Sequence, residues 1–304
     1  MEIKTPYIWK NGKLIAWDDA VDHHLSHSLH YGGGVFEGIR FYDTDKGPKI
    51  FRLKDHIDRL FYSASVVGLE IPFTKDYIMN ETIKLLENNQ EKTGYIRHIV
   101  YSGYGKMGLN PYGAKTETVI SVWKWGKYLS ENPIRVKIAK IRRVHPSTTD
   151  MNAKISGNYA NSILVSQEIK KAGFDEGLLL DTEGFIAEGP GENIFFVKGN
   201  EVVTPRLGTI LPGITRNSII HLFKDEFGIN VTERKISPEE LGDFNEAFFT
   251  GTAAEVTLIG SITDENGKEF SFGSGDENSI SQKIRKLFLE VTSGKVDKYN
   301  DWLF

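Results

Sequence analysis

The sequence contains no cysteine among its 304 residues. Disulfide bonds, iron–sulfur clusters, thiolate zinc sites and a cysteine nucleophile are therefore excluded. Proline is also scarce, with 10 residues, and 39% of the residues are hydrophobic, which is not the composition of a disordered or fibrous chain. A chain of this length can bury a sizeable core, so we predict a globular protein of roughly two domains.

A strong charge of one sign and long apolar runs are lacking as well. The 37 basic and 41 acidic side chains leave a net charge of −4, without the basic surface that nucleic acid would require. The apolar stretches fall far short of the roughly 18 residues of a membrane span, and residues 1–10 lack the layout of a signal peptide. We therefore expect a cytoplasmic protein without nucleic-acid or membrane partners.

The strand signals arrive mostly as hairpins. Asn11-Gly12 joins two short alternating runs, Tyr7–Lys10 and Lys13–Trp17, and predicts a tight hairpin. From Leu53 to Val67 the apolar residues recur at helical spacing. Further strands are expected over 40–42, 49–52, 95–101, 118–125, 134–144, 177–181, 185–188, 246–250 and 255–263, and helices over 75–88, 159–171, 216–227 and 279–291. This order favours an α+β fold with antiparallel sheets over a doubly wound parallel fold.

Polar and chain-breaking residues over 126–133 interrupt the strand and helix pattern. We place an interdomain loop there. The resulting division is a small N-terminal domain over 1–125 and a larger domain over 134–304.

Two motifs suggest other chemistries. Gly103–Gly108 has the G-x-G-x-x-G spacing of dinucleotide-binding folds, but it continues into the turn Leu109–Gly113 instead of the helix that would hold a pyrophosphate. Histidines also gather at positions 23, 24, 27 and 30, but the serines among them and the glycines after Tyr31 indicate a turn leaving a short helix, not the carboxylate and cysteine partners of a typical zinc site. Structural roles for these histidines are favoured, and we expect no metal centre.

Four other segments are unusual for a purely structural protein. Lys154 lies among small residues just before a predicted helix, and Glu188 and Glu192 flank a Gly-Pro-Gly corner between apolar runs. Gly213 precedes a helix whose first N–H groups could bind an anion, and Thr250–Ala254 ends a strand in a small-residue turn that admits a second anion contact.

Taken alone, each segment has a plain structural interpretation: a solvated loop lysine, a turn with solvated acids, or an ordinary helix start. Together they match the needs of pyridoxal 5′-phosphate. Its aldehyde requires an amine for a Schiff base, its ring nitrogen requires a carboxylate to stay protonated, and its phosphate requires donors.

In residue types and in their order along the chain, these segments, together with His30-Tyr31-Gly32 and Val35–Arg40, resemble those of the branched-chain aminotransferases of the class IV aminotransferase group. These are pyridoxal-phosphate enzymes of fold type IV, and the similarity runs through nearly the whole chain. The resemblance implies a smaller N-terminal α/β sandwich and a larger cofactor-binding domain with an antiparallel, barrel-like sheet. It also implies at least a homodimer.

The resemblance further implies roles for individual residues. Lys154 corresponds to the Schiff-base lysine, Glu188 to the partner of the pyridine nitrogen, and Tyr159 to the phenol near the cofactor's O3′. The remaining cofactor contacts, mostly at the phosphate, fall on Arg59, Leu211, Ile214, Thr215 and Thr252. The substrate contacts fall on Tyr31, Phe36, Gly38, Tyr95, Arg97, Tyr128, Gly251, Thr252 and Ala253.

The activity that the resemblance implies is transamination of Leu, Ile and Val with 2-oxoglutarate. In this interpretation Arg97 receives the γ-carboxylate of glutamate, with a structural ion pair as its competing role. The alternatives within the same fold are a D-amino-acid aminotransferase, an (R)-amine transaminase and an aminodeoxychorismate lyase. A noncatalytic, hairpin-rich binding module is the alternative from another class.

Overall fold

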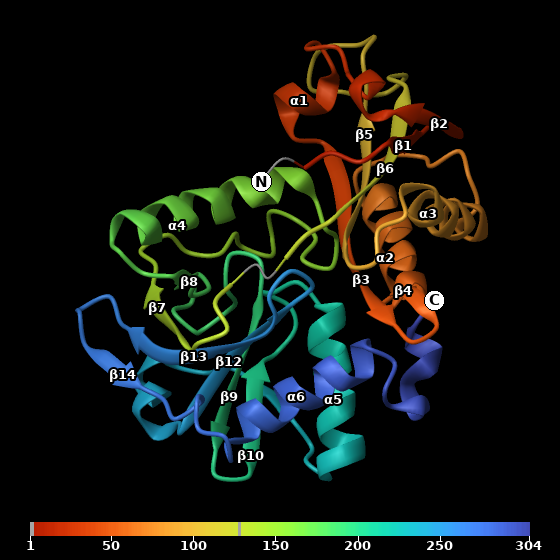
Figure 1. The fold of residues 1–304 in the computed structure, drawn as a ribbon. Coiled ribbons are helices and arrows are strands. Elements are labelled where there is room, and N and C mark those ends of the chain that lie inside the picture. The colour runs from red at the N-terminus through yellow and green to blue at the C-terminus, as the bar shows by residue number, and fades with distance from the viewer. Residues whose placement is uncertain (1–2, 127–128) are drawn as a thin grey trace. The chain divides into compact units, whose positions relative to one another are not determined.

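The computed structural model describes residues 3–126 and 129–304, which form two compact units (Figure 1). The first unit contains residues 3–126, Ala153–Asn158 and Val291–Phe304, and the second contains the described residues between these segments. This division differs in two places from the continuous segments expected from the sequence. The short segment that carries Lys154 pairs with a strand of the first unit, and so does the C-terminus, where Phe304 and Ile50 exchange two backbone hydrogen bonds.

A six-stranded, wholly antiparallel sheet forms the first unit, in the order β2-β1-β6-β5-β3-β4. Its strands are β1 (Tyr7–Lys10), β2 (Lys13–Ala16), β3 (Gly34–Thr44), β4 (Gly47–Ile50), β5 (Gly94–Ser102) and β6 (Thr116–Trp123). The hairpin predicted at Asn11-Gly12 is confirmed, and both turn residues have the positive φ that a two-residue hairpin loop requires. The strand expected at 40–42 in fact begins at Gly34, because β5 pairs with it along its length.

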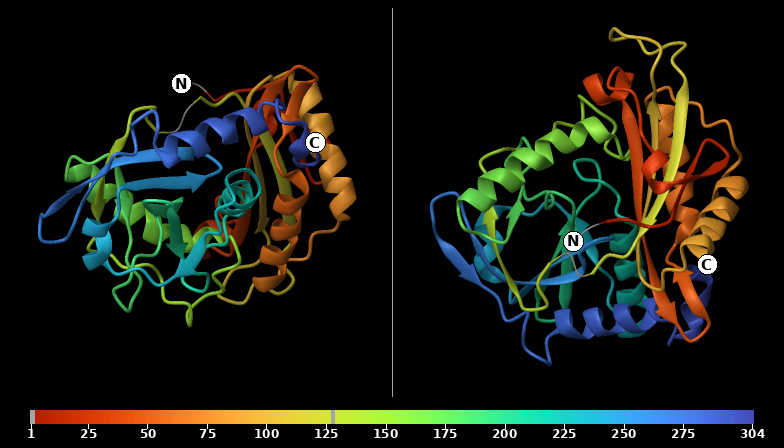
Figure 2. Two further views of the ribbon diagram at one scale, coloured as in Figure 1. Left: turned by 90° about the horizontal axis from the view of Figure 1, so that it is seen from below. Right: turned by 45° about the horizontal axis from the view of Figure 1, so that its top comes forward.

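Two helices, α2 (Leu53–Val66) and α3 (Lys75–Asn89), cover one face of this sheet (Figures 1 and 2). The apolar positions of α2 recur every three or four residues, which places them on one helix face against the sheet. A shorter helix, α1 (His27–Tyr31), precedes β3. The loop with the dinucleotide-like glycines connects β5 to β6 and opens no helix, as expected.

The second unit contains an eight-stranded sheet in the order β11-β10-β9-β12-β13-β7-β8, with β14 paired to β13. Its strands are β7 (Ile134–Ile138), β8 (Glu176–Leu178), β9 (Asn193–Lys198), β10 (Glu201–Pro205), β11 (Thr232–Arg234), β12 (Glu246–Gly251), β13 (Glu255–Thr263) and β14 (Glu269–Ser271). Three pairs of this sheet depart from the antiparallel pairing that we expected: β7–β8, β7–β13 and β10–β11 are parallel. Helices lie between β7 and β8 and between β10 and β11 in the chain, and parallel neighbours need such crossover connections.

Three helices accompany this sheet: α4 (Tyr159–Lys171), α5 (Ile214–Phe227) and α6 (Ile280–Thr292). Helix α4 packs through Val165 and Ile169 against Leu179, and the α5 ring of Phe223 lies 6.3 Å from that of Phe248 in β12. The strand expected over 134–144 ends at Ile138. The one expected over 185–188 forms only isolated bridges, since the Gly-Pro-Gly corner turns the chain away.

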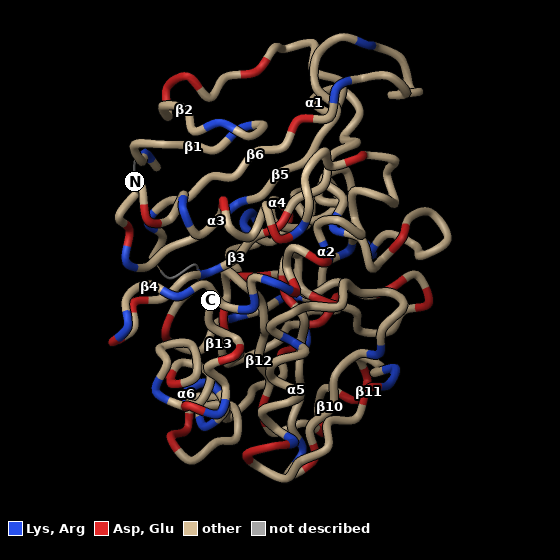
Figure 3. The backbone as a smooth tube through the Cα atoms, turned by 90° about the vertical axis from the view of Figure 1, so that its right-hand side faces the viewer, with Lys and Arg blue, Asp and Glu red and all other residues tan. Residues whose placement is uncertain are grey.

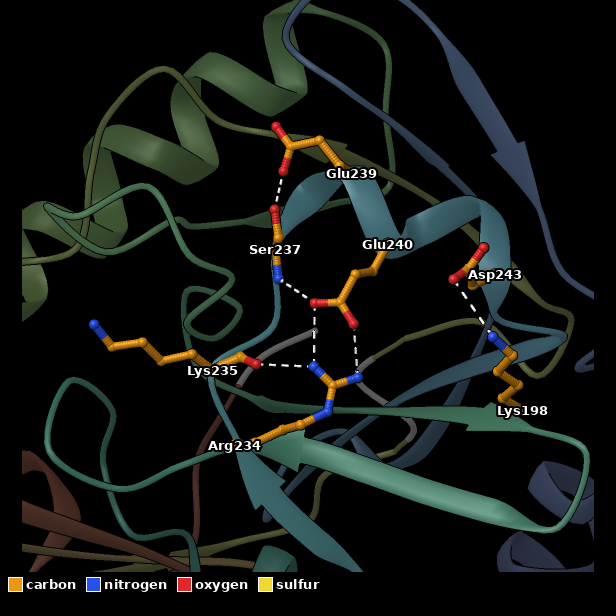
Figure 4. Close-up of polar contacts among 7 residues, drawn as sticks. All are labelled: Lys198, Arg234, Lys235, Ser237, Glu239, Glu240 and Asp243. Atoms are coloured by element: carbon orange, nitrogen blue, oxygen red, sulfur yellow. Dashed lines mark hydrogen bonds and ion pairs between the residues drawn. The ribbon is translucent and has the colours of Figure 1, made fainter.

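The described residues also form four short 3₁₀ helices: η1 (Trp17–Asp19), η2 (Ser156–Asn158), η3 (Pro238–Asp243) and η4 (Asp297–Trp302). Figure 4 shows the start of η3, where the Ser237 N–H donates to Glu240 Oε1 at 2.8 Å, the glutamate contact of a capping box. The Arg234 guanidinium also donates to Glu240, at 2.7 Å, and thereby ties the end of β11 to η3. The hydrogen bond from Arg234 holds the pKa of the Glu240 carboxyl below its ordinary value.

Lysine and arginine are interspersed with aspartate and glutamate along both units (Figure 3). In the described parts of the chain, no helix combines the length and the apolar character that crossing a bilayer would demand.

Candidate active site

Lys154 belongs to a segment that runs along the edge of β3. Ile155 forms an antiparallel bridge with Val35, and the Phe36 N–H donates to the Lys154 carbonyl at 3.2 Å. The Lys154 N–H donates to Ser63 Oγ of α2 at 2.9 Å. The lysine backbone is thus held from two sides, and its half-buried side chain places Nζ 4.9 Å from the centre of the Phe36 ring.

Four of the predicted substrate residues share one face of the first sheet. Gly38 pairs directly with Arg97, and the Arg97 guanidinium lies 4.8 Å from the Phe36 ring and 5.4 Å from the Tyr95 ring. A Cβ at Gly38 would lie 1.7 Å from the Tyr95 hydroxyl, so only glycine permits this arrangement. The Arg97 Nε is buried and has no hydrogen-bond partner within the described residues, which leaves a donor for a bound group.

Arg59 projects from α2 toward Glu37 on the helix-covered side of β3. Its Nε and Nη2 donate to the two Glu37 carboxylate oxygens at 2.5 and 2.9 Å, and His56 Nδ1 donates to the same carboxylate at 2.7 Å. Burial alone would raise the pKa of Glu37, but the Arg59 charge and the His56 contact outweigh it and hold that pKa far below the ordinary value. Burial lowers the pKa of His56, which therefore donates as a neutral ring.

Tyr31 ends α1 and is exposed, with its ring 4.7 Å from that of His27. The structure therefore places it in the first unit, in contact with histidines of its own helix. Tyr128, another predicted substrate residue, lies outside the described residues.

Glu188 is 5% exposed in the second unit and is bound by three groups. Arg143 Nε forms an ion pair with its Oε1 at 2.7 Å, while Asn193 Nδ2 and the Leu211 N–H donate to Oε2 at 3.1 and 3.2 Å. One cation and two hydrogen-bond donors around a buried carboxylate favour its anionic form. Leu211, expected among the cofactor contacts, thus uses its backbone amide to hold Glu188.

The turn before α5 has the features of an anion site. The helix begins at Ile214, and its N-cap residue is Gly213, which has no side chain to cap the first turn. The amides of Ile214 and Thr215 therefore point out of the helix end, where the dipole favours a negative charge. A Cβ on Gly213 would lie 2.0 Å from Asn193 Oδ1, so this turn packs directly on the residue that holds Glu188.

The turn between β12 and β13 lies against the same corner. It contains the predicted contacts Gly251, Thr252 and Ala253, and a Cβ on Gly251 would lie 3.2 Å from the Gly191 carbonyl oxygen. The Thr250 hydroxyl is buried and has no hydrogen-bond partner in the described part of the chain. This orphaned donor, beside small residues, fits a second contact with a phosphate.

Tyr159, the first residue of α4, lines a pocket of about 590 Å³ with Pro190 and Gly191. The second unit therefore brings together segments that are far apart in the sequence: the glutamate corner, the α5 turn, the β12–β13 turn and this phenol. Across residues 3–126 and 129–304, no three histidine, aspartate or glutamate side chains gather as metal ligands would.

The donor set suits pyridoxal 5′-phosphate. An amine and an arginine are available in the first unit, and the second unit provides an anionic carboxylate, uncapped helix amides and an orphaned hydroxyl. Sequence reasoning missed the residues that support these groups: Arg143, Asn193, Glu37, His56 and Ser63. Only the folded chain brings them to their partners, so no local pattern could have identified Arg143.

Comparison with known proteins gives a consistent result. Residues 34–262 match the family model described as "Amino-transferase class IV". The chain is 41% identical over 299 residues to the branched-chain-amino-acid aminotransferase of Pseudomonas aeruginosa, an alignment that covers 97% of this chain and 95% of that protein. It is 38% identical over 306 residues to the Escherichia coli K12 enzyme of the same name, covering 99% and 97% of the two chains.

Solved structures are similar as well. A branched-chain aminotransferase from Thermoproteus uzoniensis with norvaline has a TM-score of 0.92 and 37% identity, and 99% of each chain is covered. The branched-chain amino acid aminotransferase from Thermobaculum terrenum, solved in its PLP-containing holo-form, has a TM-score of 0.91 and 32% identity, covering 99% of this chain and 98% of that one. The expected α+β fold with two sheets is thereby confirmed.

Proposed function

The chain belongs to the class IV aminotransferase family, and from this we propose that it transfers the amino group of Leu, Ile and Val to 2-oxoglutarate with pyridoxal 5′-phosphate as cofactor. The products are branched 2-oxo acids and L-glutamate. The observation that carries the proposal is the buried Glu188 carboxylate, bound by Arg143, Asn193 and Leu211 directly beside the uncapped start of α5. The carboxylate suits the protonated ring nitrogen of the cofactor, and the anion-binding turn beside it suits the phosphate.

When bound, the cofactor supplies an aldehyde and a ring that accepts electrons. Lys154 would bind the aldehyde carbon covalently until the amino group of the incoming substrate displaces it. The freed, neutral Nζ would then take the α-proton of that amino acid. Glu188 would hold a proton on the ring nitrogen. Arg59, the Ile214 and Thr215 amides and Thr252 would bind the phosphate, and the Tyr159 phenol would lie at O3′.

The aromatic face of the first sheet would receive the substrate side chain. Phe36 and Tyr95 offer an apolar wall, and Gly38 leaves room beside it. Arg97 lies over both rings, so a planar guanidinium is available for the γ-carboxylate of glutamate. An unpaired carboxylate buried on such a wall would cost several kcal/mol, and Arg97 removes that cost. From the family resemblance we also propose Tyr31, Tyr128, Gly251, Thr252 and Ala253 as substrate contacts.

A homo-oligomer, at least a dimer, is also part of the proposal. Large apolar side chains are exposed on α1 and on the β5–β6 loop, with Leu29 at 71%, Leu109 at 85% and Tyr112 at 82%. Exposed apolar patches of this kind favour association. Light scattering on the purified chain would measure the mass of the oligomer.

We further propose that the protein is cytoplasmic, since its proposed substrates are small soluble metabolites. Fractionation of expressing cells would test this location.

A donor screen tests the proposed activity. Both enantiomers of Leu, Val, Ile, Glu, Ala and 1-phenylethylamine would be offered with 2-oxoglutarate. We expect the L-enantiomers of Leu, Ile and Val to react fastest. Preference for D-Ala, or for (R)-1-phenylethylamine, would instead identify one of the other transaminases of this fold, and pyruvate release from aminodeoxychorismate would identify the lyase.

A further inference from the structure

We propose that Glu37, assisted by His56, is a positioning residue that fixes the Arg59 guanidinium for the cofactor phosphate and fixes its spacing from Lys154. This inference rests on the proposed function, because it assumes that Arg59 binds the phosphate. Glu37 itself faces the buried side of the sheet and touches neither substrate nor cofactor in this assignment. It would act only through the arginine.

The geometry of α2 places the relevant groups together. His56, Arg59 and Ser63 follow one another at intervals of three and four residues, so they lie on one face of the helix. Glu37 lies on the helix-facing side of β3, because strand residues alternate between faces and its neighbour Phe36 lies on the opposite one. The Glu37 carboxylate therefore joins β3 to this face of α2.

The two contacts with Arg59 set its orientation. A guanidinium is planar, and Glu37 binds the edge formed by Nε and Nη2. Fixing that edge also fixes the direction of Nη1. The arginine side chain is 12% exposed and the glutamate side chain is fully buried, so solvent screens this pair little.

His56 holds the carboxylate from a second direction. Its Nδ1 donates to Glu37 Oε2 at 2.7 Å, and the ring is buried. Because the ring is neutral, it adds a hydrogen bond without adding a positive charge that would compete with Arg59 for the carboxylate. The Glu37 anion thus remains paired with Arg59 and is prevented from rotating away.

The same two elements also support Lys154. Ser63, one helical turn beyond Arg59, accepts the Lys154 N–H, and Phe36, the neighbour of Glu37, donates to the Lys154 carbonyl. The phosphate-binding arginine and the reactive lysine are therefore anchored to α2 and β3. Glu37, on β3, binds Arg59 and His56 of α2 and so joins these two elements near both the arginine and the lysine.

Cofactor affinity tests the proposal without relying on turnover. The dissociation constants of full-length apoprotein would be measured by fluorescence for pyridoxal 5′-phosphate and for pyridoxal, which lacks the phosphate. In Glu37→Gln the new amide places a donor against Arg59 or His56, both of which are donors themselves. We expect the affinity for pyridoxal 5′-phosphate to fall roughly 30-fold and that for pyridoxal to fall less than about 3-fold.

An Arg59→Ala variant distinguishes the proposed role of Arg59 at the phosphate from the proposed positioning role of Glu37. The measured quantity is the affinity for pyridoxal 5′-phosphate divided by the affinity for pyridoxal. If Arg59→Ala leaves this ratio unchanged, Arg59 does not bind the phosphate, and the proposed role of Arg59 fails. If Arg59→Ala lowers the ratio but Glu37→Gln does not, only the present inference is overturned. We expect both to lower it, and we expect Glu37→Gln to add less than about 3-fold in the Arg59→Ala background.

Two further variants guard against a folding defect. Asp55→Asn removes the acid that pairs with Arg52 at 2.7 Å on the same helix, and it should leave the affinity ratio unchanged. His56→Leu removes the second support of the carboxylate and should lower the ratio about 5-fold, whereas His56→Asn, which keeps a donor near the Nδ1 position, should restore it. Equal ratios in His56→Leu and His56→Asn would overturn the role of His56 even if Glu37→Gln does not fold.

Discussion

Arg143 Nε lies 2.7 Å from Glu188 Oε1, and only 11% and 7% of the two side chains are exposed. The pair joins the segment after β7 to the corner before β9. Glu188 is therefore a buried carboxylate that Arg143 stabilises as an anion, and the proposed contact with a protonated ring nitrogen requires an anion.

Replacing Glu188 with Gln should slow the chemistry far more than it weakens cofactor binding. A neutral amide cannot hold the ring nitrogen protonated, while the phosphate contacts stay in place. One charge-assisted hydrogen bond corresponds to roughly 10- to 100-fold, so we expect a loss of at least that size in the half-reaction with L-Leu. Stopped-flow spectroscopy would measure it. Near-normal rates would move the role elsewhere, with Glu192 on the same corner as the next candidate.

Removing the counter-charge should destabilise the protein. Truncating one member of a buried charge pair typically costs about 2–5 kcal/mol, so Arg143→Gln should lower the free energy of unfolding by that amount. The neighbouring Arg142 provides the control, because its pair with Glu265 leaves about a third of each side chain exposed. Such pairs contribute about 0–1 kcal/mol, so Arg142→Gln should unfold nearly like the parent in urea. Similar losses in both variants would contradict the special role of Arg143.

Lys154 should carry the cofactor covalently. We expect a visible absorption band that disappears when L-Leu is added without a keto acid and returns with 2-oxoglutarate. Borohydride reduction followed by peptide mass spectrometry should place the adduct on Lys154. A reducible lysine adduct that persists in Lys154→Ala would show that this assignment is wrong.

Arg97→Leu should separate the two substrate classes. The variant keeps the apolar wall for leucine but leaves the γ-carboxylate of glutamate without its charged partner. Activity with Glu and 2-oxoglutarate should fall by roughly 30-fold or more, and the half-reaction with Leu should be spared. Equal losses for Leu and Glu would mean that Arg97 supports the fold instead of recognising the side chain.

Acid should destabilise the first unit through His98. The Thr82 hydroxyl uses its single hydrogen for the Ile78 carbonyl, so His98 Nε2 must be the donor in their 2.8 Å contact. Burial lowers the pKa of His98 to about 3 from 6.5, which keeps the folded ring neutral. Between these values only the unfolded chain takes up the proton, so stability is lost as the pH falls below about 6.5, with a limiting slope of about 1.4 kcal/mol per pH unit.

Urea unfolding between pH 7 and 5 would measure that slope. His98→Gln, whose amide can still donate to Thr82, should reduce this slope, whereas replacing the exposed His24 with Gln should not. The slope that remains belongs to the buried His56, whose pKa is also lowered by burial. This range lies above the ordinary pKa of Glu37, 4.5, so the loss of that buried carboxylate charge does not contribute. An unchanged slope in His98→Gln would count against the neutral buried ring.

The sequence by itself determined the local elements and the family resemblance. Asn11-Gly12 specified a hairpin because both residues tolerate positive φ, and the apolar spacing from Leu53 specified α2 because one helix face had to be buried. The four chemically unusual segments, including Lys154 and Glu188, could be recognised because their residue types at those positions suit one cofactor. These features depend on neighbours within a few positions of the chain.

Only the tertiary structure decided which residues support the site and how the second sheet is paired. The parallel pairs of β7 with β8 and of β10 with β11 depend on crossovers through α4 and α5, which local patterns do not specify. Arg143 reaches Glu188, and Arg59 reaches Glu37, across long separations in the chain. Buried charges require partners, but any of many arginines could have met that requirement, and packing alone selected these two.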